Sequence, residues 1–185
     1  MVNHIQEAKI NIFYLDISPT LAAQYAVDRH VVKMILETCQ LLSTAHRVLD
    51  GTQTQDKSKT GRKVTRYVLN DYREDILYQA THINHPSSVW CRESIQNYEW
   101  LHAHLGALLK EYTYRYGKTH SCHNLYEVLT VRPLNIQHGV FTQPTPAMDS
   151  SFIISQDSVE NYRNYYKQGK VHLFAWTKRE KPVWL

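Results

Sequence analysis

The sequence predicts an all-α fold: a single compact domain of about five to seven helices built around two long packed helices. Residues 28–49 and 88–116 repeat apolar side chains at helical spacing, and no stretch of similar length shows sustained strand-like alternation. With 185 residues, of which 43% are apolar and 21% charged, the chain is long enough to bury one core. We therefore expect residues 1–185 to form one domain without an internal linker.

The first long helix and its flanks carry clear start and stop signals. Residues 10–15 are the one candidate for a short strand. Pro19, directly after a serine, predicts the start of a short helix, because proline suits a first helical turn. Asp28 can cap the first long helix and Gly51 can end it.

The segment between the two long helices predicts a loop, a short helix and a turn. Residues 51–65 are rich in Gly, Thr, Gln and Ser and predict a flexible basic loop. Residues 66–80 fit a short helix. Residues 81–86 predict a turn, because Pro86 disfavours helix at the residue before it. The second long helix should then run to about residue 116, with Gly117 as its stop.

The last third of the chain predicts shorter elements. Residues 125–129 fit a short helix, and residues 132–150 hold three of the six prolines and look irregular. Asp157 can cap a final helix that ends near residue 166. Residues 174–185 contain three aromatic side chains, so we expect this ending to pack against the rest of the chain.

The charge pattern favours a partner that carries phosphate. The formal net charge is +4, and thirteen Tyr and eleven His add side chains that stack or titrate. The basic residues gather in two clusters, which are Lys57, Lys59, Arg62, Lys63 and Arg66, and Arg163, Lys167, Lys170, Lys178, Arg179 and Lys181. Ordinary solubilising charge would explain these clusters equally well.

Several classes of site have no signature here. The chain has no membrane-length apolar run, no export signal and an odd set of three cysteines, which fits a reducing cytosol. It has no CxxC, HExxH, GxSxG, Walker A or GxGxxG motif. His82 and His85, like His120, Cys122 and His123, are spaced as metal ligands can be, but neither set is specific. We expect no metal, no cofactor and no membrane partner.

The polar residues of the first long helix form one narrow stripe. His30, Lys33, Glu37, Gln40 and Thr44 follow at spacings of three and four, which places them within an arc of about 100°. Because the rest of this helix is apolar, the stripe is either a thin face to water or the wall of a polar pocket. In a pocket, His30, Lys33 and Glu37 would be the catalytic residues. In water, Lys33 and Glu37 would form an ordinary helical ion pair.

A second set of polar residues could complete such a pocket. The second long helix carries polar residues seven positions apart. The turn before it carries an amide and imidazoles, and the final helix contains tyrosines and an arginine. Two polar stripes could face each other across one cleft, or each could face solvent. The candidate substrate-binding residues are Gln40, Asn84, His85, Arg92, Asn97, Glu111, Arg115, Lys118, His120, Tyr162 and Arg163.

Five segments resemble known phage proteins. Residues 13–16, 28–37, 82–86, 111–118 and 162–166 are similar to those of an uncharacterised family of small helical proteins of tailed bacteriophages. That resemblance implies a phage protein acting in the host cytoplasm. The chain also resembles phage pyrimidine-dimer DNA glycosylases, which are small, basic and helical and have a Tyr-Tyr-Gly-Lys-type ending. Those enzymes use an N-terminal threonine amine, whereas this chain begins Met1-Val2, so Lys33 would have to supply the amine.

Two classes of function follow from these patterns. The first is a phage enzyme acting on a nucleotide or nucleic-acid base, of glycosylase or hydrolase type, with acid–base work by His30 and Glu37. Lys33 would stabilise an anion or form an adduct. The alternative is a non-catalytic anti-defence protein that sequesters a host nucleotide signal or blocks a host defence protein. A purely structural virion part would leave the polar stripes without a purpose.

Overall fold

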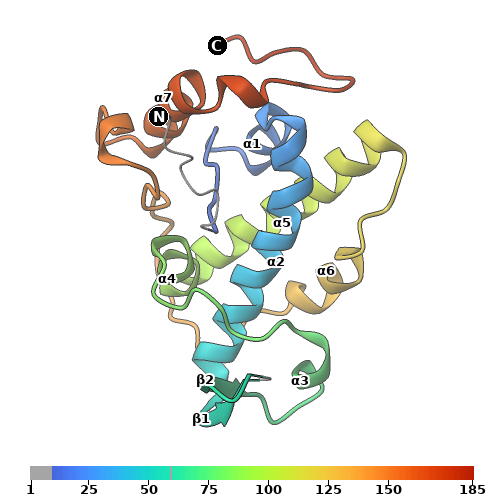
Figure 1. Cartoon of the computed structure of the whole chain (residues 1–185), viewed down its shortest axis with the longest axis vertical. Helices are drawn as coiled ribbons and strands as arrows, with labels where there is room; N and C mark the ends of the chain where they lie inside the picture. Colours follow the sequence, from blue (N-terminus) through green and yellow to red (C-terminus); the bar gives the residue numbers. More distant parts are fainter. Residues whose placement is uncertain (1–9, 59) are drawn as a thin grey trace.

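The computed structural model describes residues 10–58 and 60–185, and its described part is mostly helical (Figure 1). Residues 1–9, with Met1 and Val2, and the predicted basic residue Lys59 lie outside the described part. The described helices are α1 (Pro19–Tyr25), α2 (Asp28–Asp50), α3 (Arg73–Ile76), α4 (Pro86–Glu93), α5 (Ile95–Tyr116), α6 (His123–Thr130) and α7 (Ser158–Gly169). Two 3₁₀ turns, η1 (Ser150–Phe152) and η2 (Val171–Leu173), and two strands complete the set.

The two long helices pack together as the sequence predicts. α2 crosses α5 near the middle of the molecule, α1 packs on α5, and α4 packs on both long helices (Figure 1). The core between them is built from side chains such as Ile35, Leu42, Leu101 and Leu105, all with no exposed surface. α2 is thus buried along most of its length, and only one strip of it faces solvent.

The second long helix is broken, where the sequence predicts one helix over 88–116. Ser94 has an extended backbone (φ −150°, ψ 156°) and separates α4 from α5. Its hydroxyl accepts a hydrogen bond from Asn97 N and donates one to Val140 O, and Ile95 N donates to Gln137 O. The break therefore anchors the irregular 132–150 segment, which a continuous helix could not do.

The expected flexible loop at 51–65 is wrong, because these residues form a hairpin. β1 (Thr52–Lys57) and β2 (Lys63–Val68) pair antiparallel, with Thr52 opposite Val68. The β-branched residues of both segments favour this structure, and Gly61 allows the turn with φ +79°. The helix expected over 66–80 shrinks to the four residues of α3.

Residues 10–15 do not form a strand, because no second strand lies beside them among the described residues. They run extended through the core, and Ile10, Ile12, Tyr14 and Leu15 are all buried. Asn11 is buried in the same run, at 7% exposure. This segment therefore closes one side of α2 with side chains instead of backbone pairing.

The chain ends and helix caps follow the sequence with one exception. Ser18 caps α1, Asp157 caps α7, and Trp176 Nε1 donates to Tyr25 O, so the aromatic ending packs on α1 as expected. Val27, not Asp28, is the N-cap of α2. The carboxylate of Asp28 instead accepts hydrogen bonds from the C-terminal segment, at Thr177 N and Oγ1.

Candidate functional site

Glu37 and Lys33 form the most chemically distinctive pair on α2. The Glu37 side chain is 11% exposed, while that of Lys33 is 45% exposed, and their Nζ–Oε1 distance is 3.1 Å. The backbone N of Asn11 donates to the other carboxylate oxygen of Glu37 at 3.0 Å. Burial raises the pKa of Glu37 above its ordinary value, although Lys33 and the Asn11 amide act to lower it. The helix thus holds a carboxylate whose burial is only partly offset by its polar partners, next to a partly exposed amine.

Asn11 ties this carboxylate to α7. Tyr162, a predicted binding residue, is fully buried, and its hydroxyl donates to Asn11 Oδ1 at 2.8 Å. The same hydroxyl accepts from Ala147 N, and Asn11 Nδ2 donates to Ala147 O. Tyr162 therefore holds the residue that holds Glu37, and it does not itself face solvent.

His30 lies one turn from Lys33 but is sealed from solvent. Its ring stacks on Phe13 with a centroid distance of 4.0 Å, and its Nδ1 hydrogen-bonds the hydroxyl of Tyr166. Burial lowers the pKa of His30 to about 3, and the nearby charges of Lys170 and Lys33 act in the same direction. His30 is therefore neutral at pH 7 and orders the packing of α2 against α7.

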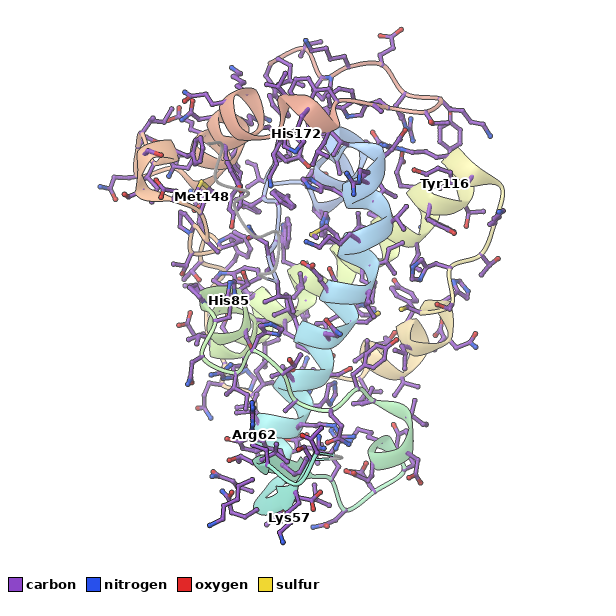
Figure 2. All side chains as sticks on the ribbon, in the orientation of Figure 1. Lys57, Arg62, His85, Tyr116, Met148 and His172 are labelled. Carbon is purple, nitrogen blue, oxygen red and sulfur yellow. The ribbon has the colours of Figure 1, made fainter. Side chains whose placement is uncertain are left out.

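A basic patch surrounds the start of α2. Arg29 and His172, both exposed, join Lys33 and Lys170 in the electrostatic environment of His30. Figure 2 labels His172 near the start of α2, on the segment that follows α7. This basic patch, defined as Arg29, Lys33, Lys170 and His172, has a charge that suits a phosphate, and Lys33 connects it to the Glu37 carboxylate.

The exposed strip of α2 continues from the patch towards the middle of the helix. Val32 and Leu36 are each 40% exposed, and Gln40 is half-buried one turn further. His82, in the turn that precedes α4, lies close enough to Glu37 to lower its pKa. The candidate site is therefore an open helix face with Glu37 at its edge.

The remaining predicted residues are not gathered at this face. Asn97 is buried and binds Trp90 O and the backbone and hydroxyl of Thr142. His85 Nδ1 caps α4 by accepting from Ser87 N, and Arg92 donates to Ser88 Oγ. Asn84 and Lys118 are exposed, and His120 Nδ1 accepts from Cys122 N. Arg163 binds Leu15 O and pairs with Asp16.

Glu111 and Arg115 form a separate, fully paired network. Arg115 donates to Glu111, to Asp28 and to the carbonyl oxygens of Gln24 and Ala26. Arg179 adds two further hydrogen bonds to Glu111, each at 2.9 Å. Although burial acts to raise the pKa of Glu111, the two guanidiniums hold it below its ordinary value. These residues join α5, α1 and the C-terminal segment.

The expected cleft between the two polar stripes is therefore not formed by these residues. Glu111 lies instead beside a groove of about 420 Å³ between α1 and α5, together with residues such as Gln24, Gly106 and Tyr126. None of His30, Lys33 or Glu37 lines that groove. The polar partners of the α5 stripe come from α1, α4 and the C-terminal segment, because those elements cover its polar side.

A buried thiol pair lies on the opposite side of α2. Cys39 and Cys122 share a hydrogen bond, and the hydroxyl of Tyr78 lies 3.4 Å from Cys122 Sγ. Cys122 follows His120 at the start of α6. Across residues 10–58 and 60–185, no three His, Cys, Asp or Glu side chains are arranged to hold a metal ion.

Two of the residues that the sequence reasoning missed come from elements other than α2. Asn11 stands in an apolar run and His172 follows α7, while Arg29 is in α2 itself but is an ordinary surface residue by pattern. The proximity of Asn11 and His172 to α2 follows only from the docking of residues 10–16 and of the segment after α7. No local spacing could have indicated it.

No protein-family model, curated protein or solved structure matches the chain. Within the described residues, no helix combines the length and the apolar character needed to cross a membrane.

Proposed function

We propose that this chain is a phage enzyme acting on a nucleotide or a nucleic-acid base in the host cytoplasm, with Lys33 and Glu37 as the reacting pair. The observation that carries the proposal is the 3.1 Å contact between a partly exposed amine and a buried carboxylate whose pKa is raised. A carboxyl group with a raised pKa is suited to proton transfer near neutral pH. An exposed ion pair on an ordinary helix face would not bury its acid.

The pair can perform base removal through a covalent intermediate. Lys33, as the neutral amine, attacks C1′ of the sugar while the glycosidic C–N bond breaks and its electrons leave with the base. The protonated Glu37 carboxyl donates its proton to the leaving base. The carboxylate so formed accepts one proton of the new ammonium and passes it to O4′ as the C1′–O4′ bond breaks, so that the nitrogen lone pair forms an imine between C1′ and Lys33. Borohydride reduces this imine, whereas water hydrolyses it and releases the sugar from Lys33.

The neighbouring residues supply binding. Arg29, Lys170 and His172, which with Lys33 surround His30, would contact the phosphates of a nucleotide bound at Lys33. Gln40 lies one turn beyond Glu37 and offers an amide to a base edge. His30 and Tyr162 act as positioning residues, because both are buried behind the face.

Incubation with a defined substrate panel tests the proposal. The panel contains duplexes with ultraviolet photoproducts, abasic sites or mismatches, and free nucleotides, each analysed by mass spectrometry. We expect one duplex to lose a base, and borohydride to trap the protein on that strand. Lys33→Ala should abolish trapping and Glu37→Gln should abolish base loss, whereas Lys110→Ala, an exposed lysine on α5, should change neither.

The same panel distinguishes turnover from sequestration. A ligand that is recovered chemically intact after denaturation of the protein would contradict the enzyme and favour the nucleotide-sequestering alternative. Binding of none of these compounds by wild-type protein at low salt would contradict both, and a host defence protein would then be the better candidate partner.

A further inference from the structure

The β1–β2 hairpin projects from the molecule at the end opposite the C-terminus (Figure 1). All six residues of β1 are exposed, and β2 is at most half-buried. The hairpin therefore buries little apolar surface of its own. Its base is attached to α2, where Arg47 Nη1 donates to Tyr67 O, while its outer part is left exposed for contact with a partner.

The two faces of the hairpin differ in charge. Side chains alternate between faces, so the register places each cross-strand pair on one face. One face has Asp56, which pairs with Arg66 at 3.7 Å, and is thereby neutralised. The other face, here called the amide–lysine face, has no acid and consists of Gln53, Gln55, Lys57, Lys63, Thr65 and Tyr67.

Like charges meet at the tip of the amide–lysine face. Lys57 and Lys63 are direct cross-strand partners, an arrangement that destabilises a sheet. The turn holds Arg62 beside them, because Ser58 N donates to Arg62 O and Arg62 N donates to the Ser58 hydroxyl. Figure 2 labels Lys57 at the lower end of the molecule and Arg62 above it, both in the region of the hairpin. A polyanion would relieve this repulsion.

We propose that the amide–lysine face enters the major groove of duplex DNA. That groove, about 12 Å wide, admits a two-stranded β-ribbon. Lys57, Lys63 and Arg62 would contact phosphates, while the amides of Gln53 and Gln55 would contact base edges, as glutamine does with adenine. The inference deepens the proposed function and rests on it, since it makes duplex DNA the form in which the substrate is bound.

The hairpin and the Lys33–Glu37 pair would contact different parts of one duplex. Lys33 and Asp50 are both in α2, separated by about 25 Å of helix at 1.5 Å per residue. At 3.4 Å per base pair this corresponds to roughly seven base pairs. A duplex of about six base pairs should therefore be too short to engage both contacts.

The salt dependence of binding tests the proposal. Fluorescence anisotropy with a 20-base-pair duplex at several NaCl concentrations compares wild type with Lys57→Ser/Lys63→Ser. We expect the log–log slope to become shallower by about 1.8, at about 0.9 per phosphate contact. The matched control is Lys110→Ser/Arg132→Ser, which removes the same charge from exposed positions outside the hairpin and should keep the wild-type slope.

Protection of guanine N7 from dimethyl sulfate then locates the groove, because N7 lies in the major groove. We expect protection by wild type and its loss in Gln53→Ala/Gln55→Ala. The proposal would be overturned by an unchanged slope in Lys57→Ser/Lys63→Ser, or by protection of adenine N3 instead of guanine N7. Equal affinity for duplex RNA, or no binding of duplex DNA, would also overturn it. Because Lys33→Ala leaves the hairpin intact, its retained DNA binding without base loss separates failure of this inference from failure of the proposed chemistry.

Discussion

Two buried carboxylates, Glu37 on α2 and Glu111 on α5, are treated in opposite ways by the fold. Glu111 accepts from the guanidiniums of Arg115 and Arg179, and its pKa is lowered. Glu37 has one amide donor and a lysine that is half in solvent, and its pKa is raised. Both residues come from polar stripes on apolar helices, so their sequence settings are alike.

The contrast between the two carboxylates distinguishes a fully paired buried charge from an incompletely paired one. A buried charge that is paired and hydrogen-bonded on every side holds elements together. Here Arg115 and Arg179 tie α5 to α1 and to the C-terminal segment. A buried charge with incomplete partners retains the free energy cost of its burial and can exchange a proton. Glu37 is the residue of the second kind.

The largest expected effect is a loss of stability in acid, caused by three buried histidines. Burial lowers the pKa of His30 to about 3 and those of His46 and His104 to about 4. In the unfolded chain these three histidines bind a proton below about pH 6.5, while in the folded chain they stay neutral. The free energy of unfolding should therefore fall from about pH 6.5 to pH 4, at about 4 kcal/mol per pH unit for three histidines. Urea unfolding at pH 7, 6 and 5 measures it.

Glu37 acts with the opposite sign in this experiment. Because its folded pKa is raised, the folded chain binds its proton first and gains stability as the pH falls through that pKa. Glu37→Gln should thus steepen the acid loss. The pKa of Glu111 is lowered, so Glu111 adds stability that is lost only below its ordinary range. A shallower acid profile in Glu37→Gln would contradict the contrast.

Removal of Arg115 should cost about 3–5 kcal/mol of unfolding free energy, because this buried guanidinium binds both the buried Glu111 carboxylate and Asp28. The Arg115 side chain has no exposed surface and also binds the carbonyl oxygen of Ala26. Arg115→Ala measured by urea unfolding gives the value. Lys33→Ala, the equivalent change at the other carboxylate, should cost less than about 0.5 kcal/mol. Similar losses in both variants would remove the distinction.

Glu37→Gln should abolish the proposed base release without lowering stability at pH 7. The amide oxygen can still accept from Asn11 N, and the variant no longer buries a charge. We expect an unfolding free energy equal to or above that of wild type. The paired measurement is base release with the substrate identified by the panel. A stability loss of more than about 2 kcal/mol would mean that Glu37 is structural after all.

The smallest effect is expected at Arg179. Its side chain is 31% exposed, and Glu111 retains Arg115 when it is removed. Arg179→Ala should cost about 1 kcal/mol or less, because a partly exposed ion pair contributes little. Thermal unfolding of Arg179→Ala and Arg115→Ala under the same conditions compares the two losses of stability. A loss as large as that of Arg115→Ala would show that the C-terminal segment depends on this one contact.

The helical part of the molecule was predictable because its signals are local. The starts of α1 and α7 follow Ser18 and Asp157, and Gly117 ends α5 with φ +66°. The hairpin was missed because all six residues of β1 are polar and the apolar residues of β2, Val64, Tyr67 and Val68, do not alternate regularly with polar ones. The break at Ser94 was missed because its partners lie near residue 140.

Helical periodicity, which needs no tertiary information, is enough to predict which side chains lie on which face of α2. It places Lys33 and Glu37 as neighbours one turn apart. The burial of His30 under Phe13 and of Glu37 against Asn11 could not be predicted in this way. Burial and the number of hydrogen-bond donors set a carboxylate's pKa, and here both come from segments that are distant in sequence and meet only in the folded chain.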